Sequence, residues 1–157
     1  MKKNPAPYPK LNLPACRLRV TERAGATHVW DALRGRWLVL TPEEWVRRHV
    51  VAFLSEGAGV VAANICQEYP VDMNGAPQRA DIVVTGSDGR PRMLVECKAP
   101  GVAVCGSTLD QAFRYNAVLG ARYVMLTNGL DHYLYEVAGG EYSPLKDFPD
   151  LKQAITG

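Results

Sequence analysis

The stretch from Arg79 to Lys98 constrains the fold of this chain more than any other. It contains two runs of β-favouring residues, RADIVV and RMLVECK, separated by the turn-rich segment TGSDGRP. This arrangement predicts an antiparallel β-hairpin. Residues two apart on a strand face the same side, so we expect Glu96 and Lys98 to point together. Pairing across the turn brings Asp81 within roughly 5–8 Å of Glu96, measured between side-chain origins.

The rest of the chain supplies elements around this hairpin. Thr41 is a candidate N-cap, Pro42 occupies the first helical position, and Gly57 ends that helix. The other expected elements are strands over 35–40, 60–72, 121–129 and 132–137, helices over 107–120 and 151–155, and a loop over 139–144. This order predicts an α/β or α+β fold, with a mixed central sheet of about five strands flanked by helices.

Length and composition indicate one compact domain, which we place at residues 31–157. The chain has 157 residues and is 47% hydrophobic, enough for a single core. Residues 1–30 are expected to form a flexible, proline-rich tail and lead-in. No run approaches the roughly 18 apolar residues that span a bilayer, so no membrane partner is expected. The four cysteines lack CxxC spacing and no export signal precedes them, which predicts reduced thiols and a cytoplasmic location.

Charge and motif content narrow the possible functions. The net charge of +2 permits a nucleic-acid partner without arguing for one. The three histidines form no metal-ligand pattern. The sequence contains neither a GxxxxGK[ST] phosphate loop nor a GxGxxG turn, so nothing suggests an ATP motor or a dinucleotide site.

Asp81, Glu96 and Lys98 are candidate parts of a metal-dependent catalytic site. Two carboxylates at this separation repel one another unless a cation lies between them. Mg²⁺ takes one or two protein carboxylates and completes its shell with water and phosphate oxygens. A lysine on the same face can orient or help to deprotonate a water of that shell. The alternative is the polar face of an ordinary strand, on which Lys98 forms a salt bridge.

The bare pattern of an acid followed by [Asp/Glu]-x-Lys is weak by itself. The segment Asp150-Leu151-Lys152, with Asp131 upstream at a similar distance, matches the same pattern. It falls in an expected helix, however, where residues two apart do not face each other. The hairpin therefore distinguishes the first set from the second.

Two further acids are candidates for the same site. On a helical wheel, Glu43 falls between Val46 and Val50 on the apolar stripe, whereas Glu44 points sideways toward solvent. Glu43 could supply a third carboxylate, or it could interact with the helix dipole and reach out to solvent. Glu68 is either another acid near the site or an exposed strand end.

The helix after the hairpin offers polar side chains on one face. Gln111 and Tyr115 are four residues apart, so they lie together near its first half. They could orient a base or a phosphate, and Arg114 beside them could contact a backbone phosphate. If they stood alone, they would be the polar edge of an amphipathic helix.

Taken together in this order, TPEEWVRRHV, QEYPV, RADIVV, LVECKAPG, LDQAFRYN and YVMLTNG resemble a known family. The chain is similar to the N-terminal nuclease domain of the restriction (R) subunit of type I restriction enzymes, a member of the PD-(D/E)xK nuclease superfamily. The resemblance covers roughly residues 41–137. It implies a restriction-endonuclease-like core sheet flanked by helices, and Mg²⁺-dependent hydrolysis of DNA phosphodiesters, with Mn²⁺ as a substitute.

The resemblance also implies roles for particular residues. Asp81 and Glu96 would be metal ligands and Lys98 the catalytic lysine. Glu43 would match the first-helix acid that supports the metal, with Glu44 as an alternative. Gln111 and Tyr115 match a Q-x-x-x-Y motif. Arg114 and Arg79 are the candidate DNA-contacting cations.

Departures from the family pattern leave alternatives open. The motor domains that follow this module in full R subunits are not in this sequence, so ATP-driven translocation is not expected of it. The usual PD is AD here, Ala80-Asp81, which removes no reactive group. The chain could be an active nuclease, a subunit that works with other restriction-modification or motor subunits, or a catalytically silent DNA-binding or assembly module. Cutting both DNA strands with one site per chain would need a homodimer or two events.

Overall fold

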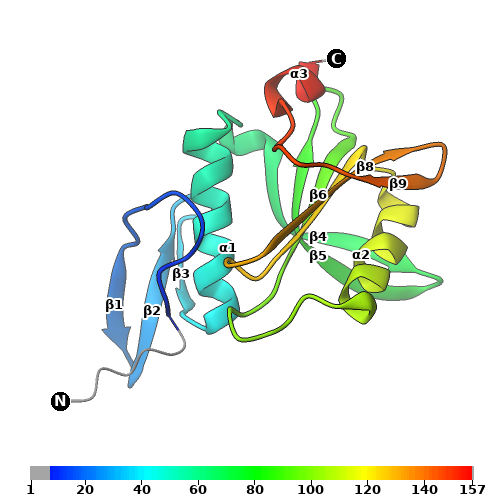
Figure 1. Cartoon of the computed structure of the whole chain (residues 1–157). Helices are drawn as coiled ribbons and strands as arrows, with labels where there is room; N and C mark the ends of the chain where they lie inside the picture. The colour runs from blue at the N-terminus through cyan, green and yellow to red at the C-terminus, as the bar shows by residue number, and fades with distance from the viewer. Residues whose placement is uncertain (1–7, 157) are drawn as a thin grey trace.

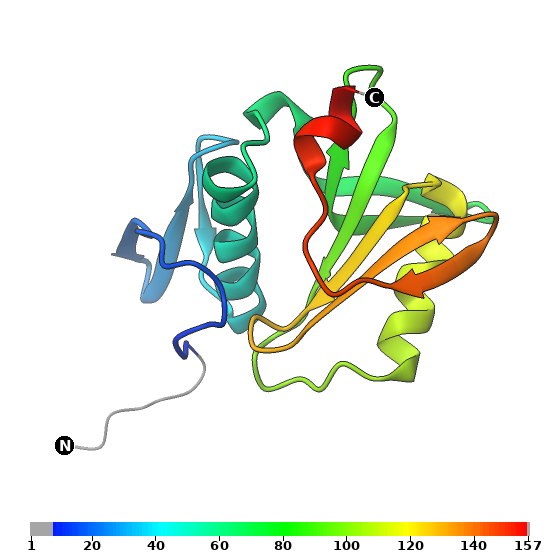
Figure 2. The same ribbon diagram turned by 45° about the horizontal axis from the view of Figure 1, so that its top comes forward.

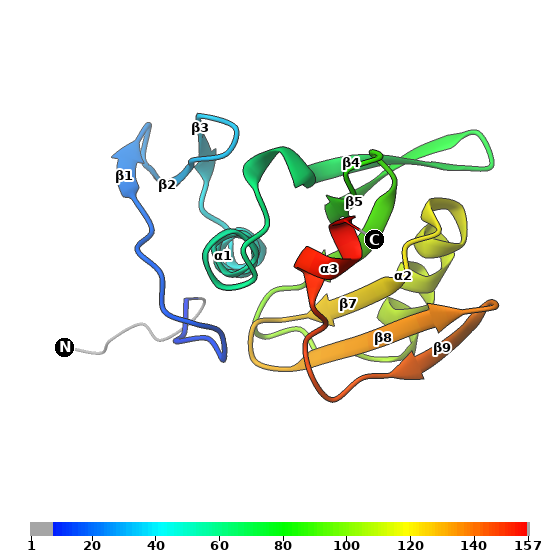
Figure 3. The ribbon, with the colours of Figure 1, turned by 90° about the horizontal axis from the view of Figure 1, so that it is seen from above.

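The computed structural model describes residues 8–156, which form two β-sheets and three α-helices (Figure 1). The expected α+β class with a mixed central sheet is confirmed. The smaller sheet is an antiparallel meander of β1 (Val20–Arg23), β2 (Ala26–Asp31) and β3 (Arg36–Val39). It lies beside α1, on the side away from the larger sheet (Figures 1 and 3).

The larger sheet has six strands in sequence order. They are β4 (Ile65–Met73), β5 (Ala76–Thr85), β6 (Pro91–Cys97), β7 (Tyr123–Thr127), β8 (His132–Ala138) and β9 (Glu141–Pro144). Neighbouring strands are antiparallel except β6 and β7, which run parallel. A parallel pair needs a crossover, and α2 (Gly106–Leu119) provides it.

The first helix, α1 (Pro42–Ala52), begins as its sequence predicts. The Thr41 hydroxyl accepts a hydrogen bond from the Glu44 amide at 3.1 Å, and Pro42 occupies the first turn. A π-helical turn, Phe53–Gly57, and a 3₁₀ turn, Ala62–Asn64, then lead into β4. The short helix α3 (Leu151–Thr156) follows the last strand.

The helices cover both faces of the larger sheet (Figure 2). One core joins α1 and α3 to the sheet, through buried residues that include Val46, Val50, Leu54, Ile82, Met93, Val95 and Leu151. A second core joins α2 to the opposite face, through residues that include Val71, Val83, Leu94, Ala112 and Tyr115. Burying one such side chain contributes about 1.5–3 kcal/mol, so the two cores hold the hairpin β5–β6 between them.

Several expectations need correction. The central sheet has six strands instead of about five, because residues 141–144, expected in a loop, pair with β8 as β9. Within the expected flexible tail of residues 1–30, β1 and most of β2 are regular strands, while residues 1–7 lie outside the described part of the chain. Residues 60–64 precede β4 as a turn and are not part of that strand.

The start of α2 also differs from expectation. The helix was expected from residue 107, but its N-cap is Cys105, whose amide donates to the Thr108 hydroxyl in a capping box. At the other end, Gly120 adopts φ +69°, the left-handed conformation that commonly ends helices. Over residues 8–156, none of the helices has the length and apolar character needed to cross a membrane.

Candidate functional site

Asp81 and Glu96 lie directly opposite each other on β5 and β6. The register pairs Ile82 with Val95, so the next position outward pairs Asp81 with Glu96. The Asp81 amide donates to Glu96 Oε1 at 3.1 Å, and the Cys97 amide donates to Asp81 Oδ2 at 2.8 Å. Each carboxyl group thus accepts a hydrogen bond from the strand that carries the other. The convergence predicted from the hairpin is present.

This pair lies in a poorly solvated environment. Glu96 is 6% exposed, and Asp81 is partly buried. Burial and the neighbouring Asp81 carboxylate raise the pKa of Glu96 to about 9. Burial also raises the pKa of Asp81, although the hydrogen bond from the Cys97 amide lowers it in the opposite direction. Without a cation, the two groups therefore hold a proton between them at neutral pH.

Lys98 follows β6 directly and is half-buried. Its amide donates to the Thr127 carbonyl of β7 at 2.8 Å, which continues the strand pairing. The positive charge of Lys98 opposes the rise in the pKa values of Asp81, Glu96 and Glu43. Its ammonium group therefore acts on all three acids. Within residues 8–156, Lys98 makes no salt bridge. The lysine is thus close to the acids without being held by one of them.

The wheel-based orientation of the first-helix acids was wrong. Glu44 is buried and bonded to Arg47 and Arg48, because both arginines follow it at helical spacing. Glu43 is exposed, yet it lines a pocket together with Asp81. Partial burial and the Asp81 carboxylate raise the pKa of Glu43. Glu43 is therefore close enough to Asp81 for the Asp81 charge to shift its pKa.

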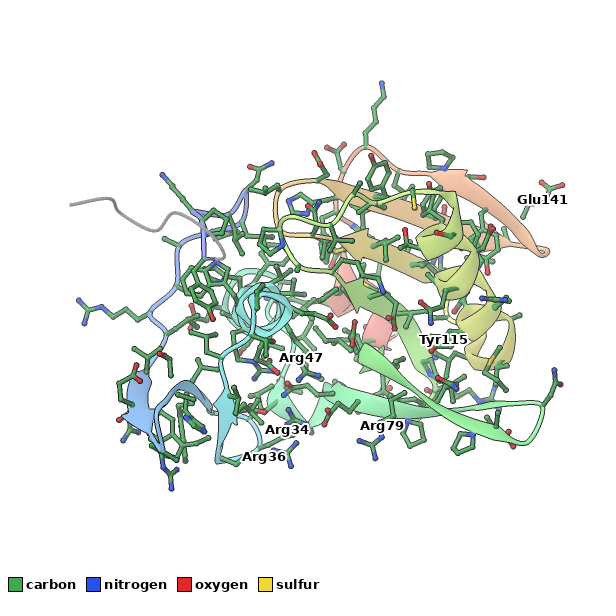
Figure 4. The ribbon with its side chains drawn as sticks, turned by 90° about the horizontal axis from the view of Figure 1, so that it is seen from below. Arg34, Arg36, Arg47, Arg79, Tyr115 and Glu141 are labelled. Atoms are coloured by element: carbon green, nitrogen blue, oxygen red, sulfur yellow. The ribbon has the colours of Figure 1, made fainter. Side chains whose placement is uncertain are left out.

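Gln111 and Tyr115 form a hydrogen-bonded chain to the hairpin. Gln111 Nε2 donates to the Tyr115 hydroxyl at 3.2 Å, and that hydroxyl donates to Gln78 Oε1 on β5 at 3.4 Å. Tyr115 is buried, whereas Gln111 is half-buried. Figure 4 shows Tyr115 on α2, and its partner Gln78 lies near the beginning of β5. The two residues therefore meet on one helix face as expected, and they tie α2 to the strand that carries Asp81.

The remaining candidates occupy different places around the site. Arg79 is exposed, two residues before Asp81, and lines the pocket with it. Arg114 is exposed on α2. Glu68 is neither at a strand end nor fully exposed: it lies in the middle of β4 and forms ion pairs with Arg34 and Arg36, which precede and begin β3.

The β4–β5 hairpin changes direction beside Asp81. Glu68 has φ +54°, and the β4–β5 ladder omits the Glu68–Asp81 pair. Ala80 packs with the α2 core although Ile82, two residues later, packs with the α1 core. Regular alternation would put both on one face, so the strand twists over at Asp81. This local irregularity opens a pocket of about 320 Å³ between α1 and the hairpin, lined by Thr41, Glu43, Glu44, Arg47, Glu68, Arg79 and Asp81.

The donor set at this position suits Mg²⁺, which accepts one or two carboxylates and fills its other positions with water. The mutual repulsion of the buried Asp81 and Glu96 side chains is the feature that a cation would relieve. Within residues 8–156, however, no three or more His, Cys, Asp or Glu side chains are grouped as a metal site. The fit therefore rests on Asp81 and Glu96, with Glu43 at the edge of the pocket.

A second pocket, of about 730 Å³, lies at the opposite ends of the strands. It is bounded by the beginnings of β6 and β7 and by the segment that leads into α3. The alternative motif Asp150-Leu151-Lys152 is also there. Asp150 accepts a hydrogen bond from the Gln153 amide and precedes α3, whereas Leu151 is buried. Asp150 therefore acts as a helix cap, and Leu151 and Lys152 lie in the helix that was expected there.

A buried ionic network near the site was not anticipated from the sequence. Asp31, at the end of β2, is fully buried and paired with Arg48 at 3.0 Å and with Arg34. Arg48 also pairs with Glu44 at 2.8 Å and donates to Gln67. Burial would raise the pKa of Asp31, but the hydrogen bond from Arg34 and the charge of Arg48 together lower it. The network ties the three-stranded sheet to α1 and β4.

Comparison with known protein families gives a match over residues 42–149 to the type I restriction enzyme R protein N terminus (HSDR_N). The fold and this match place the chain among restriction-enzyme domains. The chain belongs to the family of N-terminal domains of type I restriction enzyme R proteins. Comparison with curated proteins gave no match.

Among solved structures, the chain is similar to a fragment described as an HsdR subunit of a type I restriction enzyme from Vibrio vulnificus YJ016. The two are 25% identical, with a TM-score of 0.56. The match covers 74% of this chain and 25% of that one, so the chain spans about a quarter of the length of the fragment. The family match begins at Pro42, which leaves β1–β3 outside it.

Proposed function

We propose that this chain is a metal-dependent DNA endonuclease domain that hydrolyses phosphodiester bonds. The observation that carries the proposal is the placement of Asp81 and Glu96 opposite each other, with Lys98 immediately beyond. Membership of a restriction-enzyme family points to DNA as the substrate. The other subunits of a restriction system are the proposed protein partners.

Each residue would have a distinct part in hydrolysis. Asp81 and Glu96 would hold Mg²⁺ or Mn²⁺, with support from Glu43. The ion would neutralise negative charge on the scissile phosphate. Lys98 would hold the attacking water and stabilise the charge that builds up on the phosphate oxygens. The water oxygen would bond to phosphorus, and the bond from phosphorus to the leaving oxygen would break. One proton of the water ends on the leaving oxygen, which gives a phosphate monoester and a hydroxyl group.

The surroundings would position the substrate. Gln111 and Tyr115 would line the catalytic rim, where their hydrogen-bonded chain fixes α2 against β5. Arg79 on β5 and Arg114 on α2 are exposed cations, and they would contact backbone phosphates.

Plasmid cleavage with Mg²⁺ or Mn²⁺ tests the proposal. Wild type should nick or linearise the plasmid, whereas Asp81→Ala and Lys98→Ala should lose at least about 100-fold in rate, the scale expected when a positioned catalytic group is removed. Asp147→Ala and Lys152→Ala are matched controls, because both residues are exposed, with Asp147 lining the second pocket and Lys152 on α3. They should cleave like wild type. Equal background nicking by all five proteins would refute the catalytic role.

A second candidate function is a catalytically silent DNA-binding or assembly module that retains this fold. It is favoured by the lack of a group of three metal-binding side chains within residues 8–156. This alternative predicts salt-dependent DNA binding that Asp81→Ala does not change, and no Mn²⁺ binding in calorimetry.

A further inference from the structure

Four arginines gather on one side of the candidate site: Arg34, Arg36, Arg47 and Arg79, here called the arginine cluster (Figure 4). They come from three separate parts of the fold. Arg34 and Arg36 belong to the β2–β3 connection and the first position of β3, Arg47 to α1, and Arg79 to β5. The first two lie outside the stretch that matches the family. The three-stranded sheet thus adds cations to a site whose carboxylates are on the family core.

Three of these guanidinium groups converge on the single carboxylate of Glu68. Arg34 Nη1 lies 2.6 Å from Glu68 Oε2, Arg36 Nη2 lies 3.2 Å from the same oxygen, and Arg47 Nη1 lies 3.8 Å from Oε1. The hydrogen bond from Arg34 is the main reason that the pKa of Glu68 is lowered. Glu68 is therefore an anion held by several cations at once.

The cluster has more donors than acceptors. The buried Nη2 of Arg34 has no hydrogen-bond partner. Within residues 8–156, Arg36 pairs with no carboxylate other than Glu68, and Arg79 pairs with none. Arginine presents five N–H donors in a planar fork that matches carboxylate and phosphate oxygens. The cluster can therefore accept further negative charge.

Glu68 itself is held in an uncommon backbone conformation. Its φ of +54° in the middle of β4 is strained in a residue other than glycine. The irregular position lies opposite Asp81, and both residues line the same pocket. The strained backbone and the arginines together hold the Glu68 carboxylate beside the candidate catalytic carboxylates.

We propose that the arginine cluster binds a backbone phosphate of the DNA next to the scissile one, and that the Glu68 carboxylate occupies this phosphate site until DNA arrives. The phosphate would displace Glu68 from Arg34 and Arg36, and Arg79 would contact it from the hairpin side. The three-stranded sheet then forms part of the substrate-binding surface. The identification of the substrate as DNA rests on the function proposed above.

The first test removes cations. Binding of a short fluorescent DNA duplex is measured by anisotropy against salt concentration, with Ca²⁺ in place of Mg²⁺. Arg36→Gln/Arg79→Gln changes two exposed residues, so the protein should remain folded. The slope of log K against log salt should fall by about 0.9, the value for one lost phosphate contact. Arg122→Gln is the control. Arg122 is an exposed arginine that pairs with Glu136, and it lies directly before β7 at the second pocket. A slope equal to that of wild type and Arg122→Gln would overturn the proposal.

The second test removes the competing anion. Glu68→Gln should bind the same duplex several-fold more tightly, because the arginines no longer have a charged internal partner. Glu136→Gln, which frees Arg122 from its own partner, controls for the change in net charge. Glu68→Gly provides a second variant that lacks the carboxylate and suits the positive φ. If both Glu68 variants bind no more tightly than Glu136→Gln, Glu68 is a structural ion-pair partner and the proposal fails.

The two proposals fail in different ways. If Asp81→Ala abolishes cleavage while Arg36→Gln/Arg79→Gln binds DNA with an unchanged salt slope, the catalytic part of the nuclease proposal stands, and both the phosphate site and the phosphate contact proposed for Arg79 are refuted. If no protein cleaves but the salt slope falls in the double arginine variant, the phosphate site stands on a DNA-binding module.

Discussion

Asp81 and Glu96 exchange hydrogen bonds with each other's strands: the Asp81 amide donates to the Glu96 carboxyl group, and the Cys97 amide donates to the Asp81 carboxyl group. The arrangement fixes both side chains at the point where β5 twists over. It also holds two acids together in a buried setting, which is unfavourable when both are ionised. The stability of the protein should therefore depend on the charge of this pair.

We predict that the metal-free protein loses stability as the pH rises from about 5 to about 9. The pKa of Glu96 is about 9 in the folded chain and returns to its ordinary value of 4.5 on unfolding, so the native state binds more protons across this interval. Glu96→Gln, which cannot ionise, should be more stable than wild type at pH of about 8, by on the order of 1 kcal/mol or more. Urea unfolding in EDTA at several pH values measures this. Parallel stability curves for the two proteins would contradict it.

Mg²⁺ or Mn²⁺ should reverse this loss. A cation that binds the native pair and not the unfolded chain stabilises the fold in proportion to the logarithm of its concentration. Its binding should be stronger at high pH, where the pair no longer holds a proton. Thermal unfolding with increasing Mn²⁺ should raise the Tm of wild type and leave that of Asp81→Ala unchanged. An equal rise in Lys152→Ala and Asp81→Ala would assign the stabilisation to binding elsewhere.

The Asp31–Arg48 pair should be essential to the stability of the fold. Asp31 is fully buried between Arg34 and Arg48, so Asp31→Ala removes the carboxylate that the two guanidinium groups share, and each keeps only one acid, Glu68 for Arg34 and Glu44 for Arg48. Removing one member of a buried ion pair costs about 3–5 kcal/mol. Urea unfolding should show a loss of that size, whereas Glu136→Ala, which breaks the exposed pair with Arg122, should have a much smaller effect. Equal losses in both variants would mean that the network is not specially stabilising.

The sequence predicted the hairpin and its acids because the required signals are local. Alternating β-favouring residues and a turn set the register, and the register sets which side chains meet. The proximity of Asp81 and Glu96 could therefore be predicted without any tertiary information, and the catalytic role of these acids and Lys98 stays a prediction. Gln111 and Tyr115 followed in the same way from their spacing on a helix.

The orientation of Glu44 and the role of the first 40 residues depend on contacts that no local pattern contains. A helical wheel counts apolar neighbours, so it placed Glu44 toward solvent. In the fold, Arg48 pairs with both Glu44 and Asp31, which lies 17 positions earlier. Such a network buries charged residues that sequence patterns assign to the surface. The arginine cluster was missed for the same reason, because its members are brought together only by the docking of the small sheet.

Tyr115→Phe tests the contribution of the Tyr115 hydroxyl group separately from that of its ring. The hydroxyl joins Gln111 to Gln78, while the ring packs in the α2 core. Removing the hydroxyl should cost about 1 kcal/mol of stability. Tyr115→Ala also removes the ring and should cost about 3–5 kcal/mol. If the hydrogen-bonded chain positions the catalytic rim, Tyr115→Phe should lower cleavage while the protein stays folded, as judged by urea unfolding. Full activity in Tyr115→Phe would limit Tyr115 to packing.

The cysteines should react in an order set by their surroundings. Cys105 caps α2 and is exposed, and the hydrogen bond from Ser107, followed by those from Thr108 and the backbone, lowers its pKa. Cys97 is fully buried beside Asp81 and Glu96, and burial followed by the charges of these acids raises its pKa. Because the thiolate is the reactive form, iodoacetamide should modify Cys105 first and Cys97 only after β6 opens.

Mass spectrometry of the alkylated protein at increasing urea concentrations tests this order. Cys105→Ser should remove the fast reaction and leave the urea dependence of Cys97 labelling unchanged. Labelling of Cys97 should instead follow global unfolding, because β6 lies in the centre of the sheet between two cores. Rapid labelling of Cys97 without urea would show that the strand carrying Glu96 opens in the native protein, and the fixed Asp81–Glu96 geometry would then not hold in solution.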